Sequence, residues 1–200
     1  IDYVYLDKNR SITDTVIREL AFVDPAPSML KRYQAMPANQ YTEQEIADSL
    51  QIKIINLYSE ALSSVYKYFI KDEQENILHT YDGGFENISP YITTLSYQDA
   101  LSHCRPIVDY NFPINEDDWR TFSIIHTIKE GVGQDVLASN DTISFIQKFE
   151  NYFAYDDGSA ENGIGVEPIA GSHLAVAFDL NKSDTLTAVD IYFNSALNEA

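Results

Sequence analysis

The sequence predicts a mainly β fold, an antiparallel β-sandwich with one or two short helices, and three observations indicate this class. The 200 residues include 14 Tyr and 10 Phe but a single Trp, and Tyr and Phe are residues that favour strands. Many short strand-like runs are separated by turn residues, as is typical of β-sandwiches. These runs are not interleaved with long helical segments, which disfavours an α/β fold.

The first strand-like segments lie near the N-terminus. Residues 1–6 alternate between apolar and polar or aromatic side chains, and residues 15–23 are rich in β-branched side chains. Pro25 and Pro27 end the second segment, because proline has no N–H to donate to a ladder.

Two short helices are expected next. Ser28 is a suitable N-cap for a helix over residues 28–36. Thr42 and Glu45 have the spacing of a capping box at the start of a second helix over residues 42–50.

Strands dominate the remainder of the chain. They are expected over residues 52–57, 65–71, 77–81, 106–112, 121–128, 142–155, 173–180 and 186–193. The pairs 65–71 with 77–81 and 173–180 with 186–193 indicate hairpins. Asp82, Gly83 and Gly84 are expected to form the turn after the first hairpin, because glycine accepts positive φ.

Charge and hydropathy narrow the classes of partner. The net charge is −18, from 31 acidic and 13 basic residues, whereas nucleic-acid binding needs clustered Lys and Arg. No apolar stretch approaches the roughly 20 residues of a membrane helix. Neither a nucleic-acid partner nor membrane insertion is therefore expected. The negative charge serves solubility or, alternatively, attracts a divalent cation or a cationic partner.

The single cysteine, Cys104, excludes an intrachain disulfide. The chain begins with Ile1 instead of Met, which indicates a fragment or a processed form of a longer protein.

Two segments resemble a known group of proteins. Residues 149–161 read Phe-Glu-Asn-Tyr-Phe-Ala-Tyr-Asp-Asp-Gly-Ser-Ala-Glu. They resemble a segment of large surface proteins of Bacteroidetes that carry type IX secretion sorting domains. Residues 186–194 are similar to the next strand of those proteins, and residues 1–6 look like the last strand of a preceding concanavalin-like sandwich.

This resemblance implies a division of the chain. Residues 1–12 would be the end of a preceding β-domain or an edge strand, and residues 13–154 an Ig-like β-sandwich. Residues 155–200 would begin a second, jelly-roll-like β-unit. The resemblance also implies a protein that is secreted, or held at the outer surface or in the periplasm of a Gram-negative bacterium.

An acidic turn follows the longest predicted strand. It contains Asp156, Asp157, Glu161 and Asn162, whose carboxylate and amide oxygens are ligands that calcium prefers. Their spacing does not match an EF-hand loop, so two interpretations stand side by side: a solvated turn and a structural calcium site. No other cofactor is expected.

No catalytic centre is indicated. The four histidines, His79, His103, His126 and His173, lie far apart in the sequence and lack the spacing of metal ligands. His126 lies on the alternating side of residues 121–128 and is expected to be packed or hydrogen-bonded. His103 and Cys104 are neighbours, whose side chains would point to opposite faces of a strand, which disfavours a Cys–His nucleophile.

Trp119 is the candidate for carbohydrate binding, because an exposed aromatic ring offers a sugar an apolar surface with a polar edge. The alternative is that Trp119 covers the end of the core, since large aromatic side chains are highly buried on average.

These features predict a noncatalytic structural or adhesive β-sandwich module of a secreted or cell-surface bacterial protein. The alternative is a carbohydrate-binding accessory module of a secreted hydrolase whose catalytic domain lies outside this chain. The expected partners are neighbouring domains of the same chain and a polysaccharide or surface protein.

Overall fold

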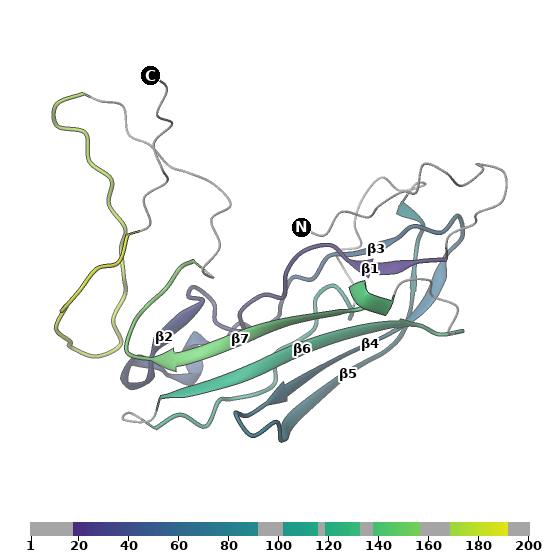
Figure 1. The fold of residues 1–200 in the computed structure, drawn as a ribbon, viewed down its shortest axis with the longest axis horizontal. Helices are drawn as coiled ribbons and strands as arrows, with labels where there is room; N and C mark the ends of the chain where they lie inside the picture. The colour runs from purple at the N-terminus through teal and green to yellow at the C-terminus, as the bar shows by residue number, and fades with distance from the viewer. Residues whose placement is uncertain (1–17, 92–101, 116–118, 133–137, 157–168, 192–200) are drawn as a thin grey trace.

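A computed structural model describes residues 18–91, 102–115, 119–132, 138–156 and 169–191 (Figure 1). Over these residues the fold is mainly β, with two sheets. The strands are β1 (Leu20–Phe22), β2 (Ala35–Pro37), β3 (Ile54–Asn56), β4 (Leu62–Lys71), β5 (Ile77–Ile88), β6 (Arg120–Glu130) and β7 (Thr142–Glu150). Turns of 3-10 helix are η1 (Ala38–Gln40), η2 (Glu43–Glu45) and η3 (Ala138–Asn140). The predicted mainly β, sandwich-like class is confirmed, whereas the strand order does not establish an Ig-like topology.

The larger sheet has five strands in the order β2-β7-β6-β4-β5. Adjacent strands of this sheet are antiparallel, except that β2 is parallel to β7. Strands β1 and β3 form a small antiparallel sheet, and β1 packs against β6. The small sheet lies on one side of the large one (Figure 1). The large sheet therefore has an inner face that is covered and an opposite, outer face.

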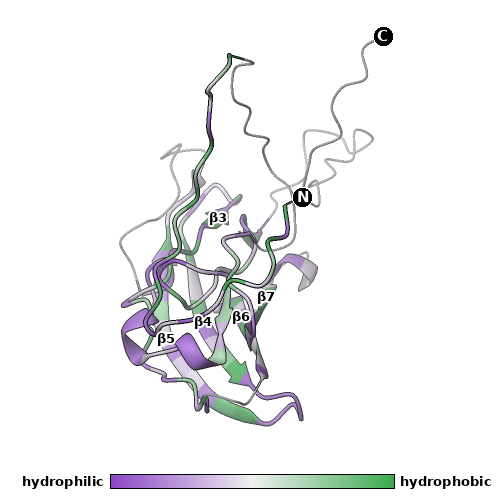
Figure 2. Cartoon of the chain, turned by 90° about the vertical axis from the view of Figure 1, so that its left-hand side faces the viewer, coloured by the Kyte–Doolittle hydropathy of each residue, from purple (hydrophilic) through white to green (hydrophobic). Residues whose placement is uncertain are grey.

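Alternation along the strands fills the core. Every second side chain of β4 and β6 is buried, and the intervening side chains are mostly half-buried. Hydrophobic and hydrophilic residues both occur along the strands of the large sheet (Figure 2). The predicted buried side of residues 121–128 is confirmed. The main buried side chains of this face are Leu62, Tyr66, Tyr68, Ile70, Phe122, Ile124, His126, Ile128, Gln147 and Phe149. Removing this apolar area from water is the main stabilisation of the fold.

The predicted hairpin of residues 65–71 and 77–81 is confirmed by the antiparallel pair β4–β5. The predicted turn at residues 82–84 is wrong, because β5 continues through these residues to Ile88. The strand continues because its backbone keeps pairing with β4 on both sides of the glycines.

The two glycines instead form an irregularity in the ladder. The register shifts between Val65 and Lys67, and Gly84 has a φ of +68°, which favours glycine. A Cβ on Gly83 would lie 3.0 Å from Cδ1 of Tyr66. Glycine at this position therefore lets the Tyr66 ring pack against the backbone of β5.

The predicted helix over residues 28–36 is wrong. Leu30 forms an antiparallel bridge with Ile46, and the end of the segment pairs with β7 as β2. The Ser28 hydroxyl accepts the N–H of Leu30 at 3.0 Å, a local bond that offers the backbone an alternative to a helix. A helix of this length is marginal by itself, so pairing with neighbouring segments prevails.

The predicted helix over residues 42–50 is also wrong. Only Glu43–Glu45 form a turn of 3-10 helix, and Thr42 makes no side-chain capping bond. The N–H of Ala47 donates to the carbonyl of Met29 at 2.9 Å. The backbone after the turn is therefore bonded to a distant segment and not to its own helix.

Several predicted strands are shorter than expected. Within the described residues, 15–23 is reduced to β1, 52–57 to β3, and 142–155 to β7. The predicted strand over residues 106–112 is wrong: Ile107 makes a single antiparallel bridge, to Ser49. Pro106 has no N–H and so cannot extend a ladder there.

The predicted C-terminal strand pair is wrong over the described residues 169–191, which contain no strand. This stretch lies beside β2 (Figure 1) and is attached through Gln40. The Oε1 atom of Gln40 accepts the N–H groups of Asn181 at 2.9 Å and of Lys182 at 3.0 Å. Its Nε2 atom donates to the carbonyl of Lys182 at 3.0 Å. A buried side-chain amide thus holds a stretch that the sequence pattern predicts as a hairpin.

Residues 1–12, the predicted end of a preceding domain, lie outside the described residues. None of the helical turns in the described part of the chain is long and apolar enough to cross a membrane.

Candidate functional site

The outer face of the large sheet carries regular rows of half-buried and exposed side chains. Strand pairing and alternation place the following residues on it: Ser63, Val65, Lys67, Phe69 and Lys71 of β4; Thr121, Ser123, Ile125, Thr127 and Lys129 of β6; Thr142, Ser144, Ile146, Lys148 and Glu150 of β7; and Thr80, Asp82 and Phe85 of β5. Hydroxyl, lysine and apolar side chains predominate. Phe85 is 76% exposed and Ile146 is 47% exposed.

Two lysines of the outer face are held in ion pairs. The Nζ atom of Lys67 lies 2.6 Å from Oδ2 of Asp82, and Nζ of Lys71 lies 2.9 Å from Oε2 of Glu75. The Lys67 ammonium and the N–H of Gly84 lower the pKa of the Asp82 carboxyl. These pairs are solvent-exposed and contribute little to stability, so the side chains can exchange partners.

Trp119 lies directly before β6 and is 63% exposed. The alternative that it covers the end of the core is therefore wrong. The neighbouring Arg120 side chain is held by Glu73, with Nε 3.2 Å from Oε1, and its guanidinium lies over the Phe122 ring. The ring of Phe122, and not the indole of Trp119, covers the core here, because Phe122 is a buried position in the alternation of β6.

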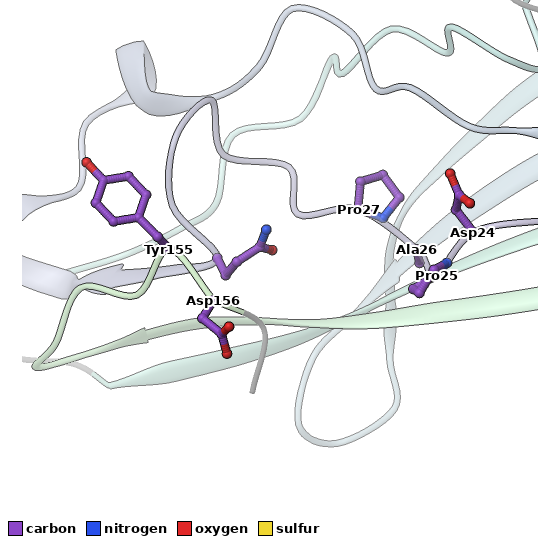
Figure 3. A pocket seen from close by; sticks show the side chains of 7 residues that line it. Asp24, Pro25, Ala26, Pro27, Tyr155 and Asp156 are labelled. Carbon is purple, nitrogen blue, oxygen red and sulfur yellow. The ribbon is translucent and has the colours of Figure 1, made fainter. Parts of the chain in front are cut away.

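The predicted calcium ligands are only partly described. Asp157, Glu161 and Asn162 lie outside the described residues. Asp156 is exposed and lines an open pocket of about 380 Å³ together with Asp24, Pro25, Ala26, Pro27, Gln34 and Tyr155 (Figure 3).

The described pocket residues do not converge on a cation. The carboxylates of Asp24 and Asp156 point away from one another (Figure 3), and Asp24 is paired with Lys53 at 2.8 Å. No group of three or more His, Cys, Asp or Glu side chains within the described part of the chain is arranged to hold a metal ion. The calcium site remains a prediction.

His126 is buried against β4, so the expectation that it is packed or hydrogen-bonded is confirmed. Its Nδ1 atom lies 2.8 Å from the hydroxyl of Tyr66, and its ring packs beside those of Tyr66 and Tyr68. Burial lowers the pKa of His126 to about 4, and burial also raises the pKa of the Tyr66 and Tyr68 hydroxyls. All three groups are therefore neutral at physiological pH.

His103 and Cys104 are both buried. Nδ1 of His103 lies 3.3 Å from Oε2 of Glu86 and 3.1 Å from Oγ of Ser102. Burial lowers the pKa of His103, although the Ser64 carbonyl and the Glu86 carboxylate oppose this change. The Cys104 thiol belongs to the hydrophobic core. Both side chains are therefore packed in the interior of the fold.

At the edge of the core, His79 and Tyr68 contact residues 107–109, and the sequence pattern does not reveal these contacts. Nε2 of His79 lies 2.8 Å from Oδ1 of Asp109, and the Tyr68 hydroxyl donates to the Ile107 carbonyl at 3.0 Å. His79 and Asp109 are 30 positions apart in the sequence, and Tyr68 and Ile107 are 39 positions apart, so both contacts depend on the tertiary structure.

The structure therefore separates the residues that the sequence singles out. Trp119 and Asp156 are exposed on different segments. His103 and His126 are buried in the core, His79 is half-buried and His173 is exposed. The lysines of the outer face, which sequence reasoning missed, were detectable as polar positions alternating with the buried positions of β4, β6 and β7.

No family model matches this chain, and no curated protein matches it.

Proposed function

We propose that the chain is a noncatalytic structural or adhesive module of a secreted or cell-surface bacterial protein, and that its binding surface is the outer face. The observation that carries the proposal is this sheet, which is buried on its inner face and presents regular rows of side chains on the other. An open sheet face with regular rows of side chains suits adhesion to an extended partner, whereas small-molecule sites are concave.

The titratable groups support a noncatalytic function. Active sites place groups with shifted pKa values in accessible clefts. Among the described residues, the strongest shifts belong to Tyr66, Tyr68 and His126, which are buried in the core. Desolvation is the first cause of each shift, so these shifts result from packing.

The segments that resemble Bacteroidetes surface proteins, residues 149–161 and 186–194, support the proposed location outside the cytoplasm. In such a protein the partners of this module would include neighbouring domains of the same chain.

A carbohydrate-binding accessory module of a secreted hydrolase is the second candidate. The exposed indole of Trp119 favours it, because Trp presents a large apolar surface with a polar edge.

The adhesive function is tested with the labelled protein on immobilised polysaccharides and isolated bacterial envelopes. One cysteine is introduced as a labelling site in each of two variants, at exposed positions. Ser144→Cys places it on the outer face, and Gln51→Cys places it in the segment before β3, away from the outer face. The buried Cys104 is protected from the reagent. A polyethylene glycol chain at position 144 is expected to abolish binding, and the same chain at position 51 to leave it intact. Equal binding by both conjugates, or no binding to any surface, would overturn the proposal.

A further inference from the structure

The outer face differs in charge from the rest of the chain. Among the described residues, its strands carry Lys67, Lys71, Lys129 and Lys148 and two acidic residues, Asp82 and Glu150. A third acidic residue, Glu75 of the turn between β4 and β5, is paired with Lys71. Four positive charges against three negative ones leave the described part of this face slightly cationic, whereas the whole chain has a net charge of −18.

Two of these lysines are available to a partner. Among the described residues, neither Lys129 nor Lys148 forms an ion pair. Lys129 is exposed and Lys148 is half-buried. Their ammonium groups can therefore bind an anion without breaking an internal salt bridge.

The spacing of the two lysines requires a long ligand. Lys148 pairs with Thr121 in the ladder of β6 and β7, and Lys129 lies eight residues further along β6, which corresponds to roughly 26 Å. A compact anion would reach one lysine, whereas an extended polyanion lying along β6 would reach both.

The side chains between the lysines indicate the chemistry of that polyanion. Thr121, Ser123 and Thr127 of β6 and Thr142 and Ser144 of β7 carry hydroxyls, each of which both donates and accepts hydrogen bonds. Such a row complements a ligand that is itself rich in hydroxyls. The core of a protein–protein interface is, by contrast, depleted in Ser and Lys.

An exposed aromatic ring completes the surface at one end. Phe85 and Lys129 flank Val65 in neighbouring strands, and Phe85 is 76% exposed. Its ring can pack against the apolar face of a sugar whose acidic group meets Lys129.

We propose that the outer face binds an acidic polysaccharide, a chain of carboxylated or sulfated sugars that lies along β6 between Lys129 and Lys148. This inference rests on the proposed adhesive function and names its partner. The negative charge elsewhere on the chain does not prevent binding, because charges more than about 8 Å from the ligand are screened at physiological salt.

The test is affinity electrophoresis of the protein in gels that contain polygalacturonate, heparin, neutral dextran or poly-glutamate. Polygalacturonate or heparin is expected to retard the protein, less so as salt increases, and dextran and poly-glutamate are expected to have no effect. The Lys129→Ser/Lys148→Ser variant is expected to bind at least tenfold more weakly. The Lys31→Ser/Lys53→Ser variant removes the same charge from exposed positions off the outer face and is expected to bind within twofold of the native protein.

Three outcomes would overturn the inference. The first is equal binding by the two double variants when circular dichroism shows both folded. The second is retardation by poly-glutamate as strong as that by polygalacturonate, which would indicate an acidic protein partner. The third is retardation by dextran alone, which would leave the proposed adhesive function standing while removing the acidic partner.

Discussion

The buried imidazole of His126 predicts that the stability of this protein falls as the pH decreases below about 6.5. Burial lowers the pKa of His126 from 6.5 to about 4. Between these values the unfolded chain binds a proton that the folded chain excludes, so acid favours unfolding. Above pH 6.5 the imidazole is neutral in both states and adds no pH dependence.

The size of the effect follows from the two pKa values. The full difference corresponds to about 3 kcal/mol of unfolding free energy, reached below pH 4. At pH 5 the expected loss is about 2 kcal/mol relative to pH 8. The groups that face the imidazole are the Tyr66 hydroxyl, 2.8 Å from Nδ1, and the ring of Tyr68, which stay neutral throughout this range. Nε2 has no hydrogen-bond partner among the described residues, so no carboxylate compensates for protonation.

The assay is urea unfolding followed by circular dichroism at pH 8, 6 and 5. In His126→Gln the difference in unfolding free energy between pH 8 and pH 5 is expected to be about 2 kcal/mol smaller than in the native protein. The control is His173→Gln, at an exposed imidazole, which should leave that difference unchanged. Because His103 and the carboxyl groups are common to all three proteins, their contributions cancel. Identical pH dependence in His126→Gln and the native protein would refute the reasoning.

Three further predictions concern the fold and the exposed aromatic ring. Gly83→Ala would place a Cβ 3.0 Å from the Tyr66 ring and is expected to lower the unfolding free energy by about 1–3 kcal/mol, measured in urea; an unchanged midpoint would show that the ring moves freely. Gln40→Ala removes the bonds to Asn181 and Lys182 and should increase amide hydrogen exchange at those two residues by roughly tenfold or more, with exchange in β6 as the internal control. Trp119→Ala should change the unfolding free energy by no more than about 0.5 kcal/mol, since the indole is exposed; if Trp119 binds sugar, the same variant should lose glycan binding, and retained binding would argue against that role.

Local pattern was sufficient to predict the strands whose alternation faces the core. Residues 121–128 alternate in polarity because the inner face of the sheet excludes water on one side only, and β6 follows this pattern. The same holds for the β4–β5 hairpin, in which a short polar turn joins two strand-like runs. His126 could be assigned to the core from its parity in the same strand.

Local pattern failed where distant backbone competes for hydrogen bonds. Residues 28–36 have an N-cap and helical spacing, but in the folded chain their polar groups meet β7. Oε1 of Gln147 accepts the N–H of Met29 at 3.1 Å, and Nε2 of Gln147 donates to the carbonyl of Gln34 at 3.0 Å. The neighbouring sequence does not predict these bonds, because Gln147 is more than 100 positions away.

The sequence by itself determined the mainly β class, the hairpin and the buried parity of β6, since each depends on a period of two residues that any sheet with one covered face requires. Only the tertiary structure decided which side chains share a surface. Lys129 and Lys148 join the same face through the register of β6 and β7, and Trp119 is left in solvent because Phe122 closes the core. Register and closure depend on contacts between strands far apart in the chain, and a linear pattern does not carry that information.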